Sequence, residues 1–124
     1  MTWVWIAAAG AAGSVCRWAV QSLVMGNRLP VFPFATAAVN LSGCFLIGLL
    51  FAVFQRRWSG VPAEVQLAVL VGLLGGYTTF STFSFETLRL VEGGGLALAA
   101  VNVLLSVAGG LAATWAGLQI GRAV

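Results

Sequence analysis

GGYTTFSTFSFE, residues 75–86, lies inside the third of four long apolar runs in this 124-residue chain. Two adjacent glycines followed by β-branched and hydroxyl-bearing residues are poor helix formers. We therefore expect a helix over residues 65–91 that breaks near residues 75–79. A broken helix at bilayer depth is tolerated only where its freed backbone groups find partners in protein, water or ions. The freed carbonyls at this break could hold a small cation.

Three further apolar runs have the length of a bilayer-spanning helix, which needs about 20 residues. They cover residues 3–25, 34–54 and 96–120, and prolines and glycines separate them. Connections this short make neighbouring helices antiparallel. The first run is not expected to be a cleaved signal, because no basic residue precedes it and it continues too far. The sequence therefore predicts an all-α membrane protein with four transmembrane helices in a single domain, residues 1–124.

The composition agrees with a membrane protein and excludes several functions. Hydrophobic residues make up 60% of the chain and charged residues 7%, whereas a soluble domain carries about 25% charge. The six arginines and three glutamates give a net charge of +3 and lie far apart, so we expect no binding of nucleic acid. Histidine and aspartate are absent, and hydroxyl groups without a base lack activation, so we do not expect an enzyme.

Positive charge is divided almost equally between the two sides of the predicted bundle. Four spans place both termini on one side with Arg56, Arg57 and Arg122, whereas Arg28 and Arg89 lie on the other. A balance of three against two hardly determines the orientation of insertion. Two interpretations stay open: a weak but sufficient preference for termini inside the cell, and insertion in both orientations with antiparallel pairing.

Polar side chains form one narrow stripe on each of two predicted helices. Thr36, Asn40 and Gly43 share a face of the second, and Asn102 and Ser106 repeat this arrangement on the fourth. Polar groups in lipid are costly without a partner, so they normally face protein or a water-filled path. Interhelical hydrogen bonding would explain one asparagine, but two matching stripes favour a pathway.

Beyond the predicted break, Phe80 and Phe83 lie one turn apart beside a track of hydroxyl side chains. The members of this track are Thr78, Ser81, Thr82 and Ser84. Ring edges carry positive potential, and amides and hydroxyls donate hydrogen bonds without a full charge. Such donors can replace the water of a small anion without holding it permanently. The residues thus indicate a small, polar and anionic solute, for which fluoride is a better fit than larger halides. The structural alternative is aromatic packing, with hydroxyls bonded to the preceding turn.

These motifs resemble those of a known family. GGYTTFSTF (75–83), together with VNLSG (39–43) and Gly10, Gly13 and Arg17, resembles the Fluc (CrcB-type) fluoride channels, and the likeness covers all four spans. The resemblance implies a multi-pass protein of a bacterial or archaeal inner membrane that exports cytoplasmic fluoride passively and so relieves its toxicity. It also implies an antiparallel, dual-topology homodimer with two pores, embedded in membrane lipid.

The resemblance also implies roles for individual residues. Phe80 and Phe83 would form an aromatic box, and Asn40 would meet fluoride there. Further pathway residues would be Ser81, Thr82, Thr36 and Ser106.

A structural sodium ion at the dimer interface is a further implication of the resemblance. The backbone carbonyls of Gly75 and Thr78 would coordinate it, with oxygens from both subunits. Asn102 and Gly110 depart from the family pattern, because some relatives have Tyr and Ser at these positions.

Two charged residues lie within predicted spans. Arg17 is expected to face an aqueous vestibule and attract anions, and the alternative is that its side chain reaches up to the membrane interface. The resemblance implies that Glu86 takes part in anion passage, and a simpler possibility is an ion pair with Arg89 at i+3.

Two other classes of membrane protein remain for comparison. A small multidrug exporter also has four helices and pairs antiparallel, but it needs an acidic residue in its first helix, where Arg17 is the only charge. A cofactor-holding subunit of a membrane complex is the second class, and the absence of histidine excludes haem held by two histidines.

Overall fold

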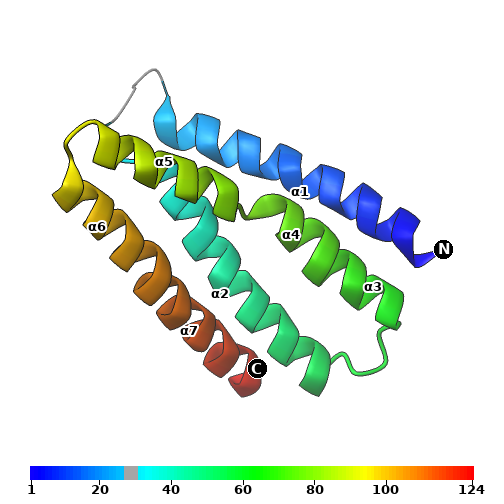
Figure 1. The fold of residues 1–124 in the computed structure, drawn as a ribbon. Helices are drawn as coiled ribbons and strands as arrows, with labels where there is room; N and C mark the ends of the chain where they lie inside the picture. Colours follow the sequence, from blue (N-terminus) through cyan, green and yellow to red (C-terminus); the bar gives the residue numbers. More distant parts are fainter. Residues whose placement is uncertain (27–30) are drawn as a thin grey trace.

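The computed structural model describes residues 1–26 and 31–124, which form four helical spans and, within these ranges, no strand (Figure 1). The first two spans are α1 (Thr2–Met25) and α2 (Phe34–Arg56). The third comprises α3 (Ala63–Leu67), a π-helical segment (Ala68–Leu73), α4 (Leu74–Tyr77) and α5 (Phe80–Glu92). The fourth comprises α6 (Leu96–Leu104), a second π-helical segment (Leu105–Gly109) and α7 (Gly110–Ala123). All four spans are long and apolar enough to cross a membrane, which confirms the predicted all-α membrane fold.

The observed spans extend beyond the predicted ones at most of their ends. The third covers Ala63–Glu92 and the fourth covers Leu96–Ala123. A run of apolar residues predicts only the part of a helix that lies in lipid. The observed helices are longer because their backbone hydrogen bonds continue into polar residues such as Glu64 and Arg56. Arg28, which enters the charge balance above, lies outside the described residues.

The spans alternate in direction, so that both termini lie at one end of the bundle (Figure 1). The α5–α6 turn lies at the opposite end. Gly94 has φ +79 there, a left-handed conformation that glycine adopts without strain. The amide of Gly95 donates to the Leu90 carbonyl at 2.8 Å and closes the turn.

Close backbone contacts hold the spans together. An added Cβ on Gly72 would lie 2.7 Å from the carbonyl oxygen of Ile6, and one on Gly121 would lie 2.8 Å from Cβ of Ala52. Small residues of this kind let membrane helices approach closely. The third span therefore packs on α1 and the fourth on α2, which leaves the region around residues 78–79 between α1 and α2 (Figure 1).

Candidate functional site

The third span is interrupted by two residues with extended backbone, Thr78 and Thr79. Their φ and ψ are −82 and 160, and −150 and 118, respectively. In a continuous helix the Thr79 amide would bond to the Gly75 carbonyl and the Thr82 amide to the Thr78 carbonyl. Here the Thr79 amide donates to Asn40 Oδ1 at 2.8 Å, and the Thr82 amide donates to Thr79 Oγ1 at 3.2 Å. The interruption thus frees the carbonyls of residues 75–78 from the helical pattern, among them those of Gly75 and Thr78.

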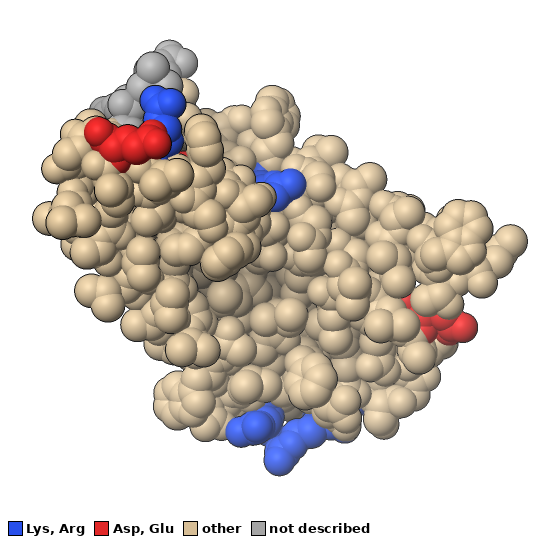
Figure 2. All heavy atoms as spheres, in the orientation of Figure 1, with Lys and Arg blue, Asp and Glu red and all other residues tan. Residues whose placement is uncertain are grey.

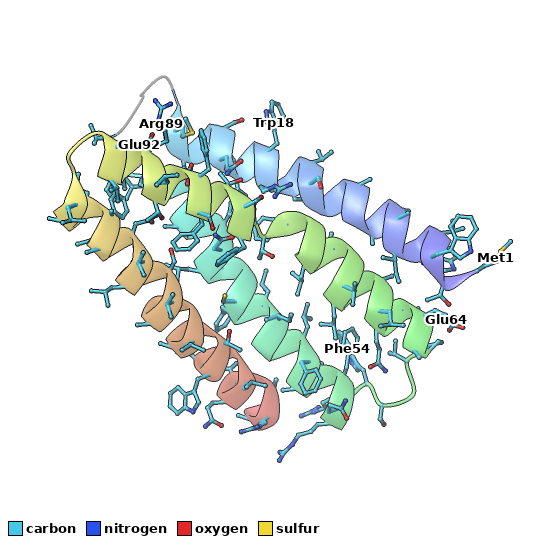
Figure 3. All side chains as sticks on the ribbon, viewed as in Figure 1. Met1, Trp18, Phe54, Glu64, Arg89 and Glu92 are labelled. Atoms are coloured by element: carbon cyan, nitrogen blue, oxygen red, sulfur yellow. The ribbon has the colours of Figure 1, made fainter. Side chains whose placement is uncertain are left out.

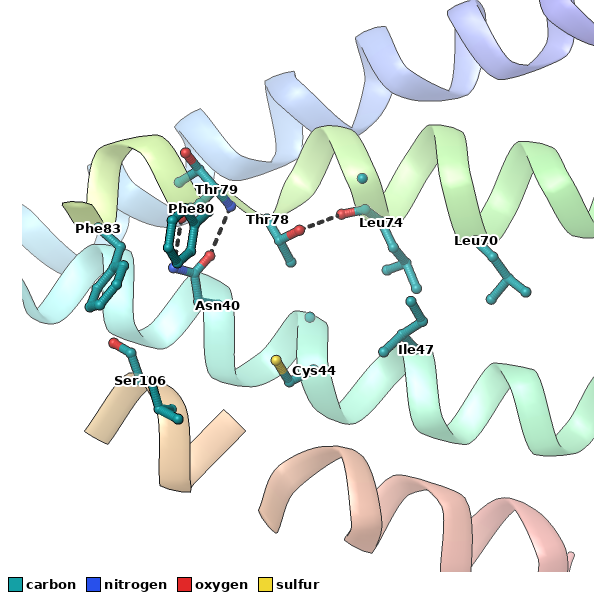
Figure 4. Close-up of a pocket in the computed structure, with 13 residues that line it drawn as sticks. Asn40, Cys44, Ile47, Leu70, Leu74, Thr78, Thr79, Phe80, Phe83 and Ser106 are labelled. Atoms are coloured by element: carbon teal, nitrogen blue, oxygen red, sulfur yellow. Dashed lines mark hydrogen bonds between the residues drawn. The ribbon is translucent and has the colours of Figure 1, made fainter. Parts of the chain in front are cut away.

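Asn40 of α2 pairs with the backbone of Thr79 in both directions. Besides accepting from the Thr79 amide, Asn40 donates through Nδ2 to the Thr79 carbonyl at 2.9 Å (Figure 4). The side chain therefore bonds to an extended residue as a neighbouring β-strand would. The amide of an asparagine has two N–H groups, so one remains for another partner.

Asn40 also lines a groove of about 350 Å³ between the break, α2 and the π-helical segment of the fourth span. Phe80, Phe83 and Ser106 line the same groove (Figure 4). The two rings are tilted by 51°, with centroids 5.4 Å apart. Phe83 is 8% exposed, whereas Phe80 is 78% exposed. Gly75 and Thr78 also line this groove, so the structure brings together six of the predicted site residues, from three spans.

Two predicted pathway residues, Ser81 and Thr82, lie at the start of α5 and outside the lining of this groove. Their hydroxyl oxygens lie 3.2 and 3.0 Å from Thr79 Oγ1, so the three side chains form a hydroxyl cluster. Thr78 and Ser84 instead donate to the preceding turn, to the carbonyls of Leu74 and Phe80. The hydroxyl track expected from the sequence is therefore divided.

A second polar group connects α1, α2 and α5. Thr36, which is 3% exposed, donates to Glu86 Oε1 at 2.9 Å and accepts from Gln21 Nε2 at 3.4 Å. Glu86 Oε2 is buried and has no hydrogen-bond partner among the described residues. Glu86 and Arg89 both line another groove of about 330 Å³, but the hydrogen bond of Glu86 is to Thr36 and not to Arg89.

Arg17 connects α1 to the break. Its Nη1 donates to the carbonyl of Thr78 at 3.3 Å, and the side chain is half-buried. The guanidinium thus contacts one of the freed carbonyls in the middle of the bundle.

Sequence reasoning missed two residues, Thr79 and Thr87, which are the hydrogen-bond partners of Asn40 and Asn102. Thr79 is the N-cap of α5 and the backbone partner of Asn40; a threonine immediately before a new helix is a recognisable N-cap signal. Asn102, which is 1% exposed, donates to Thr87 Oγ1 at 2.8 Å, and Thr87 donates to the Phe83 carbonyl at 2.7 Å. Asn102 belongs to a predicted polar stripe, but no local pattern identifies Thr87 as its partner.

Comparison with known proteins assigns this arrangement to a family. The family model described as "CrcB-like protein, Camphor Resistance (CrcB)" matches residues 4–118. A protein of Geobacter sp. (strain M21) is 49% identical over 121 residues, which cover 98% of this chain and 97% of that protein. A protein of Citrifermentans bemidjiense is 48% identical over the same shares of the two chains. A third, from Pseudomonas fluorescens (strain Pf-5), is 49% identical over 93% of this chain and 92% of its own. All three are named "Fluoride-specific ion channel FluC". The chain belongs to the CrcB-like protein family.

Proposed function

We propose that this chain is a fluoride-selective channel, not an enzyme, that exports cytoplasmic fluoride passively and so relieves its toxicity. Relatives that are 48–49% identical over nearly the whole chain are named fluoride-specific ion channels. The observation that carries the proposal is the groove in which Asn40 and Ser106 lie with the rings of Phe80 and Phe83.

The chemistry of this groove suits a small anion. An amide N–H, a hydroxyl and two ring edges can replace part of the water around fluoride, and none of them carries a charge that would hold the ion. The polar groups beyond the groove would continue the path. These are Ser81, Thr82, Thr36 and Glu86. Arg17, close to the break, would supply positive potential that attracts anions toward a vestibule.

We further propose that two copies assemble as an antiparallel, dual-topology homodimer in the inner membrane. Phe80 is 78% exposed, and Gly75, Ser81 and Ser84 are also exposed near the middle of the third span. Hydroxyl and backbone groups facing lipid are costly, so a second copy over this face would remove the cost. The nearly equal division of arginines between the two ends supports insertion in both orientations.

A structural sodium ion at the dimer interface fits the residues present. The carbonyls of Gly75 and Thr78 are among those that the break frees, and carbonyls of unwound membrane helices are suitable ligands for Na⁺. Each copy would supply these two oxygens, so that both copies hold the ion. The Thr78 carbonyl accepts one hydrogen bond from Arg17 and has a second lone pair for the ion. When bound, sodium would supply positive charge that stabilises the broken backbone.

Purified protein in liposomes loaded with fluoride and chloride tests the proposed function. We expect fluoride to leave rapidly while chloride is retained. Phe80→Ile should slow fluoride efflux because it removes a ring edge. Asn40→Asp should slow it by at least about 100-fold, because a like charge about 4 Å away costs an anion about 4 kcal/mol at an effective dielectric constant of about 20.

Phe85→Ile is the matched control for this experiment, because Phe85 is exposed on the same helix but does not line the groove. It should leave efflux unchanged. Equal efflux of the two halides, or no efflux from correctly folded protein, would refute the assignment.

A further inference from the structure

Three arginines gather at one end of the bundle, where α2 and α7 end. Arg56 is the last residue of α2, Arg57 follows it, and Arg122 lies in the last turn of α7. Arg56 Nη1 donates to the carbonyl of Arg122 at 2.9 Å, and all three residues are exposed. Figure 2 shows the blue side chains of this arginine cluster side by side at the lower edge of the molecule.

No glutamate forms a salt bridge with the cluster within the part of the chain that the structure describes. Two of the three glutamates of the chain, Glu86 and Glu92, belong to α5, and Glu64 lies at the start of α3. Figure 3 places Glu64 at the same end of the bundle but on a different helix, α3, and Glu92 at the opposite end. The helix dipoles favour cations at the last turns of α2 and α7, but they leave most of the positive charge of three adjacent guanidinium groups uncompensated.

The position of the cluster identifies the anion that can compensate it. α2 and α7 end two membrane spans, so their last residues lie at the level of lipid headgroups. Trp58, which is 52% exposed and has its ring 5.9 Å from that of Phe54, adds an aromatic anchor typical of this level. Guanidinium groups bind phosphate oxygens through paired N–H donors. We propose that the arginine cluster binds the phosphate of an anionic membrane lipid.

The cluster is separate from the proposed fluoride path. Arg56 is 16 residues from Asn40, which corresponds to about 24 Å along α2. The opposite end of the bundle differs in charge, because Arg89 has Glu92 at i+3 on the same helix (Figure 3). Each copy therefore has three clustered arginines at one end, whereas at the other end Arg89 has an acidic neighbour on its own helix. This inference is independent of the proposed function, and its test does not require fluoride flux.

Native mass spectrometry of the full-length protein tests the proposal. The protein is reconstituted in equal amounts of phosphatidylglycerol and phosphatidylcholine, extracted, and analysed for retained lipid. We expect the wild type to retain phosphatidylglycerol in preference to phosphatidylcholine. Each of Arg56→Gln, Arg57→Gln and Arg122→Gln should lower this preference about fivefold, because each basic residue near the surface contributes about that factor. Arg89→Gln, at the other end, is the matched control and should change it little.

Arg57→Gln keeps the test valid if the other variants fold poorly, because the Arg57 side chain makes no hydrogen bond to any residue that the structure describes. Arg57→Lys should retain part of the preference, since it keeps the charge and loses the paired donors. Equal retention of the two lipids by the wild type would overturn the proposal. A loss in Arg89→Gln as large as that in the cluster variants would also overturn it.

Discussion

Two asparagines lie in the apolar helices of this protein, and each is bonded to the region of Phe80 and Phe83. Asn40 pairs with the backbone of Thr79, directly before Phe80. Asn102 bonds to Thr87, whose hydroxyl in turn bonds to the Phe83 carbonyl. Both amides thus fix the position of α5 relative to its neighbours. Asn102 contacts α5 from the fourth span but does not line the groove.

A double-mutant cycle between Asn102 and Thr87 measures this contribution. Asn102→Ala and Thr87→Val each remove one partner, and the double variant should be more stable than the sum of the two losses predicts. We expect a coupling free energy of about 0.6 kcal/mol, and at most about 1.7, as for other hydrogen bonds between membrane helices. Unfolding in mixed detergent gives the free energy of unfolding of each variant. Ser84→Ala should show no coupling to Asn102→Ala, because the Ser84 hydroxyl bonds to the Phe80 carbonyl of its own helix. Additive losses in the Asn102–Thr87 cycle would contradict the prediction.

The sequence predicts candidate polar residues more readily than their partners. Asn40, Phe80 and Phe83 stand out because amides and paired rings are conspicuous in apolar runs, and the structure places them around one groove. The bond between Thr36 and Glu86 joins residues 50 positions apart, and periodicity along one helix contains no information about which residue of another helix lies opposite. The roles of these residues in anion passage stay predictions.

At the level of the helices, backbone contact between α2 and α7 determines the frame around the groove. Gly48 on α2 and Gly117 on α7 are both buried, and an added Cβ on either would meet a backbone carbonyl of the other helix, that of Thr114 or Phe45. Backbone cannot move aside as a side chain can. The two helices would therefore have to separate to accommodate any larger residue.

Gly48→Val and Gly117→Val should each lower the free energy of unfolding by about 1–3 kcal/mol, the usual cost of overpacking. Gly60→Val is the control, because an added Cβ at Gly60 has nothing within 4 Å. Unfolding in mixed detergent, with fluoride efflux as a second measurement, should separate the first two variants from the control. Stability equal to that of the wild type in Gly48→Val would be inconsistent with this packing.

The elements themselves are largely predictable from sequence. Apolar length defines the four spans because lipid admits only a long apolar helix, and the spans lie where the runs of hydrophobic residues do. The extent of the extended segment is less predictable. The low helix propensity of glycine leads us to expect a break over residues 75–79, whereas the structure keeps Gly75, Gly76 and Tyr77 in α4. Tertiary bonds decide the difference, because Asn40 is the partner that makes extended backbone favourable at Thr79.

At the scale of the whole molecule, aromatic and polar residues are exposed near the middle of the third span. The groove and the hydroxyl cluster include exposed residues near the middle of a span, among them Phe80 and Ser81. This distribution supports the proposed homodimer. The sequence does not predict which residues of the third span are exposed, because the same apolar pattern suits a helix facing lipid and a helix facing a second protein.

Tags on the C-terminus test dual topology in cells. We expect accessibility from both faces of the membrane in similar amounts, because the arginine balance hardly favours one orientation. Adding charge at the end of α2 and in the loop after it, with Gln55→Arg and Ser59→Arg, should direct the termini predominantly to the cytoplasmic side. Accessibility of the wild type from a single face would exclude insertion in both orientations.

The exposed ring of Phe80 has a consequence for how cells could make this protein safely. If the homodimer is the conducting form, a newly inserted copy supplies only one side of the ion pathway, and lipid covers the exposed ring of Phe80. A newly inserted copy would then conduct no ions until it pairs with a second copy of opposite orientation. At low abundance, ion flux would rise with roughly the square of the number of polypeptides, so that a cell could regulate its resistance steeply through modest changes in transcription.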